Sequence, residues 1–116
     1  MARRKLEKAN IYFPDNPIND RLKGDLFVAF KRYEQAASYF LSAVDREPRN
    51  ADFNHATAFF FHYWMNNEND VKKKIMLYKK SIIYYNRALN IDPYNANYKL
   101  NRKRLKNEYK ILLRKT

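Results

Sequence analysis

The feature that most constrains the fold of this chain is an internal repeat with an offset of 45 residues. An alanine, a proline and an asparagine–alanine pair recur with identical spacing, first within residues 43–51 and again within residues 88–96. The same offset aligns further large residues, namely Tyr33 with Tyr78, Tyr39 with Tyr84, Phe40 with Tyr85 and Val44 with Leu89. Because several positions agree at one offset, we infer that the chain contains two copies of one structural unit.

The composition favours helices. One glycine and four prolines among 116 residues leave little material for tight β-turns, so helices joined by short loops are expected. Hydrophobic residues make up 46% of the chain and charged residues 31%, which is typical of a folded domain rather than a disordered segment. At this length the chain is expected to form one domain with a modest core.

Cysteine is absent, which excludes disulfide bonds, thiol catalysis and thiolate metal sites. The chain has no apolar run of about 18 residues, and its N-terminus lacks the apolar core of a secretory signal. These features predict an intracellular protein, and they leave the cytoplasm and an organelle such as the mitochondrion open.

Residues 17–50 have the pattern of two consecutive helices. Asn16 is a suitable N-cap and Pro17 a suitable first helical residue. The first helix is predicted over about residues 17–32, with a buried stripe formed by Leu22, Leu26, Phe27 and Phe30. The second is predicted over about residues 33–47 and ends at Pro48. Its inward-facing residues are expected to be Ala36, Phe40, Ala43 and Val44.

This stretch resembles a tetratricopeptide repeat (TPR) helix pair. The glycine, aromatic, alanine, phenylalanine and closing proline of that 34-residue pattern fall here at Gly24, Phe27, Ala36, Phe40 and Pro48. The resemblance implies an all-α fold of antiparallel helix pairs in a right-handed α-solenoid. It divides the chain into a basic N-terminal arm and linker (1–16) and a TPR-like domain (17–116). That domain would contain a first repeat (17–50), a second repeat (51–95) and a C-terminal capping helix (96–115).

The second repeat is expected to contain an insertion. The offset of 45 residues exceeds the 34-residue period by 11, and the pattern is regular from both ends as far as the region of residues 66–80. Three asparagines within residues 66–69 indicate a loop there. Asp70 is expected to cap a lengthened, lysine-bearing second helix over about residues 71–90.

The TPR resemblance also implies a protein-binding groove. In this family the concave face, formed mainly by the first helix of each pair, binds a peptide or a helix of a partner protein. Most aromatic residues in 58–64 are expected in the core, with Phe59 and Tyr63 facing the groove. The set of Lys, Asn and Arg residues by which one TPR subclass binds chaperone carboxylates is not reproduced. The positions assigned to the groove are Arg21, Asp25, Val28, Asp52, His55, Phe59, His62, Tyr63, Asn97, Leu100 and Arg104.

Positive charge is concentrated outside these groove positions. The chain has 24 Lys and Arg against 12 Asp and Glu, a formal net charge of +12, whereas residues 17–50 are almost neutral. Such asymmetry is typical of contact with an anionic partner, and the phosphates of RNA are neutralised by side chains of this kind. The residues assigned to anion contact are Arg3, Arg4, Lys5, Lys72, Lys73, Lys74, Lys99, Arg102, Lys103, Lys106, Lys110 and Arg114.

No catalytic chemistry is indicated. A single glycine does not suffice for a nucleotide-binding glycine loop, and no Ser–His–Asp set or carboxylate pair stands out. His55 and His62 lie two helical turns apart, whereas a metal site would more often use histidines four residues apart plus a carboxylate. We interpret them as groove or packing residues. The prediction is a non-enzymatic protein with no catalytic residues, cofactor, metal or small-molecule substrate.

Two functional hypotheses follow. The first is a TPR scaffold or adaptor that binds a protein partner as a small subunit of a larger assembly. The second is an RNA-contacting structural subunit of a ribosome or another ribonucleoprotein, including a mitochondrial one, which would hold RNA through its backbone phosphates. Attachment to a membrane surface ranks below both, because the apolar side of the last helix has tyrosine and leucine but no tryptophan or phenylalanine.

Overall fold

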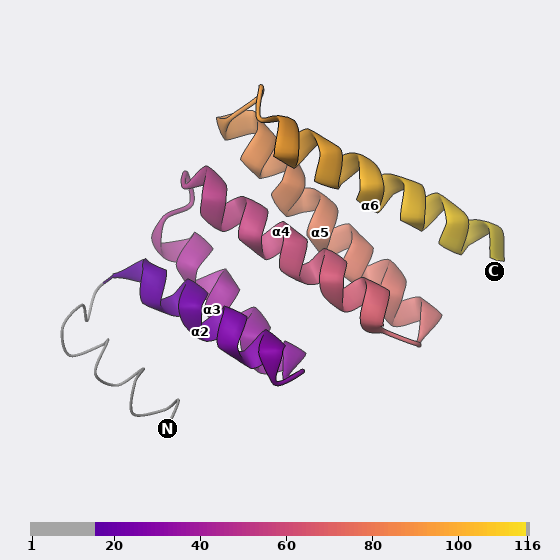
Figure 1. The fold of residues 1–116 in the computed structure, drawn as a ribbon, viewed down its shortest axis with the longest axis horizontal. Coiled ribbons are helices and arrows are strands. Elements are labelled where there is room, and N and C mark those ends of the chain that lie inside the picture. Colours follow the sequence, from indigo (N-terminus) through magenta and orange to yellow (C-terminus); the bar gives the residue numbers. More distant parts are fainter. Residues whose placement is uncertain (1–15, 116) are drawn as a thin grey trace. The chain divides into compact units, whose positions relative to one another are not determined.

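The computed structural model describes residues 16–115, and these residues are all-helical. The helices are α2 (Pro17–Ala29), α3 (Tyr33–Arg46), α4 (Ala51–Asn67), α5 (Val71–Ile91) and α6 (Ala96–Lys115) (Figure 1). The chain divides after Pro48 into two compact units. We call the part containing α2 and α3 unit 1, and the part containing α4, α5 and α6 unit 2. The predicted basic arm, with Arg3, Arg4 and Lys5, lies outside the described residues.

Short polar side chains fix where the helices begin. The Asn16 side chain accepts a hydrogen bond from the backbone N–H of Ile18, and Asp70 accepts one from the N–H of Lys72. The asparagines before α4 and α6, Asn50 and Asn95, each accept a bond from the N–H three residues ahead. Each cap provides a partner for an N–H group that has none within the helix. The predicted caps at Asn16 and Asp70 are confirmed, and α6 begins at Ala96 as predicted.

In unit 1 the contact between α2 and α3 is built around Gly24 and Phe40. A Cβ atom placed on Gly24 would lie 2.7 Å from Cε2 of Phe40, so the phenyl ring rests directly against the α2 backbone. Phe40 is 3% exposed, and the other residues predicted to face inward from α3, namely Ala36, Ala43 and Val44, are also buried. The inward face predicted for α3 is therefore confirmed.

The buried stripe predicted for α2 is wrong in two positions. Leu22 is 52% exposed and Phe30 is 60% exposed. Within unit 1, α2 packs against α3 through Gly24 and through Phe27, whose ring stacks on Tyr39 with centroids 5.4 Å apart. Leu22 precedes Gly24 by two residues and so lies on nearly the opposite side of the helix. Spacing identified an apolar side of α2, but α3 covers only part of it.

The turn between α2 and α3 contains a residue in the left-handed region. Lys31 has φ 58°, its N–H donates to the carbonyl of Val28, and the N–H of Arg32 donates to the carbonyl of Phe27. These two bonds form the helix-ending arrangement in which glycine usually takes the left-handed position. They satisfy two carbonyls that the end of α2 would otherwise leave without partners.

The 11 additional residues of the second copy lengthen both of its helices. α2 and α3 have 13 and 14 residues, whereas α4 and α5 have 17 and 21. α4 is thus longer by four residues and α5 by seven, while the connections keep their lengths. The predicted long second helix is confirmed, but the predicted loop at 66–69 is wrong for Asn66 and Asn67, which belong to α4. The sequence pattern did not predict the extra turn at the end of α4.

In unit 2 the helices α4 and α6 run in the same direction and α5 runs back beside them (Figure 1). Small residues let α4 and α5 approach closely: the Ser81 hydroxyl donates to the carbonyl of Ala58 at 2.7 Å, and both residues are fully buried. Rings of both helices stack beside this contact, with Phe61 against Trp64 and Tyr84. α6 adds its buried side chains, Tyr98 and Leu105, to the same core.

Candidate binding site

Three polar contacts join α4 to α6, and each joins residues 46 positions apart. The Tyr98 hydroxyl donates to the Asp52 carboxylate, the Asn101 amide donates to Nε2 of His55 at 3.0 Å, and His62 contacts Glu108. The His55 ring also stacks on Tyr98, with centroids 4.4 Å apart. A constant separation shows that the two parallel helices stay in register over this length.

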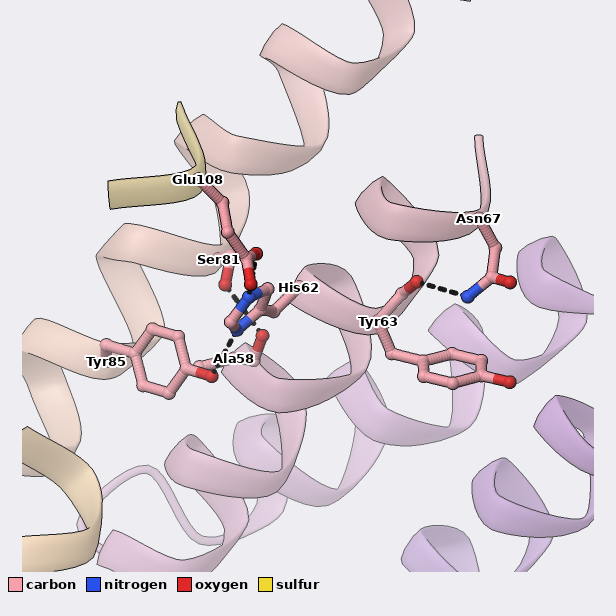
Figure 2. A network of polar contacts seen from close by, with 7 residues as sticks. All are labelled: Ala58, His62, Tyr63, Asn67, Ser81, Tyr85 and Glu108. Atoms are coloured by element: carbon pink, nitrogen blue, oxygen red, sulfur yellow. Dashed lines mark hydrogen bonds and ion pairs between the residues drawn. The ribbon is translucent and has the colours of Figure 1, made fainter. Parts of the chain in front are cut away.

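His62 is the centre of the buried part of this network (Figure 2). Its Nε2 lies 2.6 Å from the Glu108 carboxylate, and its Nδ1 lies 2.9 Å from the Tyr85 hydroxyl. The assignment that gives each atom a partner is a neutral imidazole that donates from Nε2–H to Glu108 and accepts the Tyr85 O–H at Nδ1. One side chain thereby ties α4 to both α5 and α6.

The Tyr85 phenol is kept neutral by its surroundings. Burial, and then the nearby charge of Glu108, raise the pKa of Tyr85 well above its ordinary value. In the unfolded chain a tyrosine ionises near pH 10. The stabilisation due to this burial is therefore complete below about pH 10 and is lost as the pH rises further, because the unfolded state then releases a proton that the folded state retains.

We expect Tyr85→Phe to have two effects on unit 2. At pH 7 it removes the hydroxyl from Nδ1 of His62 and should lower the free energy of unfolding by about 1–2 kcal/mol. Between pH 10 and pH 11 it should remove a loss of about 1 kcal/mol that the unchanged protein shows, because the tyrosine of the unfolded state ionises progressively over this range. Denaturant unfolding followed by the fluorescence of Trp64, the single tryptophan, measures both. Tyr94→Phe, at a highly exposed tyrosine, is the control and should leave both values unchanged.

Beside this network, four side chains remain open to solvent. On α4, Phe59 is 49% exposed and Tyr63 is 43% exposed; on α6, Leu100 and Arg104 are exposed. Figure 2 shows the Tyr63 ring pointing away from His62. We call these four residues the α4–α6 face. Phe59 and Tyr63, which were predicted to face the groove, are exposed, and their neighbours Phe60, Phe61 and Trp64 are buried as predicted.

Phe59 on α4 and Arg104 on α6 lie between the same two polar contacts along their helices. Phe59 follows His55 by four residues and precedes His62 by three, while Arg104 lies between Asn101 and Glu108 on α6. The contacts His55–Asn101 and His62–Glu108 therefore lie on either side of them along the two helices. The Phe59 ring is flanked by both imidazoles, at centroid distances of 6.2 and 6.3 Å. An aromatic ring and a guanidinium are thus both accessible between two fixed contacts.

The remaining groove positions are distributed as follows. Three of them, Asp52, His55 and His62, contact α6, and His62 is also buried. Their polar groups are therefore already engaged within unit 2. Asn97, at the start of α6, is exposed. The groove positions of unit 1 lie along α2, where Arg21 and Asp25 are exposed and Val28 is half-buried.

Within residues 17–115, the net positive charge lies in unit 2. Residues 17–48 carry five basic and five acidic side chains, whereas residues 49–115 carry 15 basic and five acidic ones, a formal net charge of +10. All five carboxylates of unit 2 have partners within the unit: Asp52 with Tyr98, Glu68 with backbone N–H groups and Lys73, Asp70 as a helix cap, Asp92 with Asn95, and Glu108 with His62. Most of the basic side chains project into solvent without a carboxylate beside them.

The predicted anion-contacting residues of unit 2 fall into two groups. Lys73 and Arg102 have structural contacts, since Lys73 pairs with Glu68 and lies over the Trp64 ring, and Arg102 donates to the Asn86 side chain. Lys74 is half-buried. The exposed members are Lys72, Lys99, Lys103, Lys106, Lys110 and Arg114.

Within residues 16–115, no three His, Asp or Glu side chains lie close enough together to hold a metal ion. None of the helices in this part of the chain is both long and apolar enough to cross a membrane.

The polar contacts that Tyr98, Asn101 and Glu108 of α6 make with α4 were not predicted from the sequence. A signal for them was present. The spacings of three and seven residues between Asp52, His55 and His62 recur between these three partners. Matching polar spacings on two helices predicted to run in parallel would have indicated the contacts.

No protein-family model matches this chain, and no curated protein matches it. The resemblance to TPR proteins therefore rests on the residues of this chain alone.

Proposed function

We propose that this protein is a non-enzymatic, TPR-like scaffold that binds a segment of a partner protein on the α4–α6 face. It would act as a small subunit of a larger assembly, with its helix pairs stacked as a right-handed α-solenoid. The observation that carries the proposal is the pair of parallel helices, bridged by partly buried polar contacts, with Phe59 and Arg104 exposed between two of these contacts.

The chemistry of this face suits a particular kind of segment. Phe59, Tyr63 and Leu100 offer apolar surface for an aliphatic or aromatic side chain, and aromatic residues with arginine are typical of the residues that contribute most to protein binding. Arg104 offers a guanidinium to a carboxylate, which it can hold through two hydrogen bonds. A partner segment with an apolar residue close to an acidic one is therefore the expected occupant.

The scaffold proposal is tested by affinity capture from RNase-treated lysate of the source cells, followed by mass spectrometry. We expect Phe59→Ala with Arg104→Ala to lower recovery of the main partner at least tenfold, a loss typical of residues that dominate an interface. Ile83→Ala with Lys79→Ala is the matched control, because it removes one exposed apolar and one exposed basic side chain from α5. Equal recovery of the partner with both double variants would show that the α4–α6 face does not bind it.

A second function is favoured by a separate observation. Because the carboxylates of unit 2 have internal partners while most of its basic side chains do not, unit 2 presents a largely uncompensated positive surface. This supports an RNA-contacting role in a ribosome or other ribonucleoprotein, with contacts to phosphates rather than to base edges. The two functions use different faces of unit 2 and are compatible within one assembly.

A further inference from the structure

The outer side of α6 carries a file of four lysines: Lys99, Lys103, Lys106 and Lys110. They are separated by four, three and four residues, so they lie along one face of the helix. All four are exposed. With a rise of about 1.5 Å per residue, the file extends over about 16 Å. We call these residues the lysine file.

The other sides of α6 are already occupied or carry different chemistry. Tyr98 and Leu105 are buried in unit 2, and Glu108, the one acidic residue of α6, contacts His62. Arg102 is held by Asn86 of α5, and Arg104 belongs to the α4–α6 face. The lysine file is thus a surface of uniform positive charge, without an acidic side chain of α6 beside it.

An exposed aromatic ring stands at the start of this file. Tyr94, in the turn before α6, is 88% exposed, the most exposed of the large hydrophobic residues in the described part of the chain. The Lys99 ammonium lies 5.5 Å from the centroid of its ring. A tyrosine ring that makes so little contact with its own protein adds little to folding, but it offers a flat surface on which a nucleobase can stack.

We propose that Tyr94 and the lysine file form a site for single-stranded RNA, in which the lysines contact successive phosphates and one unpaired base stacks on Tyr94. The combination of a basic track with an aromatic platform is the general design of sequence-tolerant single-strand binding. A duplex would lack an accessible base for Tyr94. A membrane-surface helix would need its apolar side for the lipid, whereas Tyr98 and Leu105 of α6 are buried in unit 2.

The inference gives a defined site to the RNA contact of the second candidate function. It does not depend on peptide binding by the α4–α6 face, because Arg104 and Leu100 lie on a different side of α6 from the file.

The test measures binding of the full-length protein to a fluorescein-labelled oligouridylate of about 15 nucleotides by anisotropy, over about 50–200 mM KCl. We expect Lys103→Gln, Lys106→Gln and Lys110→Gln together to weaken binding at least tenfold at the lowest salt. They should also reduce the slope of log affinity against log salt by about 2, since each phosphate contact on a single strand contributes about 0.7. Tyr94→Ala should weaken binding roughly tenfold at unchanged slope, and Tyr94→Phe should restore it.

The matched control removes the same number of charges from exposed positions of unit 2 outside the file, as Arg49→Gln, Lys80→Gln and Arg87→Gln. It should change affinity less than about threefold, because these three side chains lie outside the lysine file and contact no phosphate in the proposed site. An equal loss of affinity with this control would mean that the overall positive charge binds the RNA. It would contradict a specific site at the lysine file. Circular dichroism establishes that each variant is folded.

Four further results would overturn the proposal. A duplex of the same length that binds as tightly as the single strand, with no effect of Tyr94→Ala, would eliminate the stacking site. Vesicles containing phosphatidylserine that displace the RNA through the same lysines would identify a membrane surface as the partner. No binding to the oligouridylate at the lowest salt would overturn both this site and the RNA-contacting function. RNA binding that persists unchanged in the triple file variant would reject the site alone.

Discussion

Replacing Phe40 with alanine is expected to lower the free energy of unfolding of unit 1 by about 3–5 kcal/mol, the usual cost of truncating a buried aromatic residue. The ring is 3% exposed and lies against the backbone of α2 at Gly24, where no side chain can move in to fill the space. A cavity would therefore remain between α2 and α3. Denaturant-dependent hydrogen exchange at the amides of these two helices measures the loss.

Phe30→Ala is the matched control for this prediction. It removes the same side chain from the same unit, but Phe30 is 60% exposed, so we expect a loss of less than about 0.5 kcal/mol. A loss below about 1 kcal/mol for Phe40→Ala would show that the helix-pair register is wrong, because Phe40 occupies the phenylalanine position from which the register was set.

The second large effect is expected at Leu105, which is fully buried and lies on α6 between Asn101 and Glu108. Leu105→Ala should lower the free energy of unfolding of unit 2 by about 2–5 kcal/mol. Because the remaining contacts of α6 with α4 are mainly polar, we expect the amides of α6 to exchange earlier than those of α4 and α5. Trp64 fluorescence reports unit 2 as a whole, and hydrogen exchange resolves the helix.

Leu100→Ala is the control in the same helix, since Leu100 is 47% exposed and its truncation should cost less than about 0.5 kcal/mol. If both leucines cost the same, α6 is not anchored through the side that contains Tyr98 and Leu105, and the parallel α4–α6 arrangement would have to be abandoned.

The helix starts and the end of α3 could be predicted because they depend on local chemistry, whereas α2 ends at Ala29, three residues before the predicted end. Asn16, Asp70 and Asn95 each satisfy an N–H within three residues, and Pro48 follows the end of α3 almost at once. Such interactions involve residues that are close together in the sequence. The division of the 11 extra residues between α4 and α5 could not be predicted in the same way, because lengthening either helix by whole turns keeps its apolar side in place.

Contacts between helices were harder to predict. Periodicity identifies the apolar side of α2, but it does not say how much of that side one partner helix covers, and Leu22 and Phe30 are exposed as a result. The same difficulty applies to His62. Its spacing from His55 places both on one side of α4, while its role depends on Tyr85 and Glu108, which lie 23 and 46 residues further along the chain.

Under the two proposals, the two sides of α6 would contact two different partners. One side, with Leu100 and Arg104, adjoins the exposed aromatic residues of α4, and the other carries the lysine file. A subunit that holds a protein segment on one side of a helix and RNA on the other would link them over roughly the width of that helix, about 10 Å.

The most direct test of the scaffold proposal is site-specific photocrosslinking in the source cells. A benzophenone amino acid is introduced at Phe59 in one protein and, as control, at Met76, an exposed residue of α5, in another. The account predicts that position 59 forms a crosslink to a defined partner protein, that this crosslink survives RNase, and that position 76 does not form it. Identical products at both positions, or no protein crosslink at position 59, would contradict it.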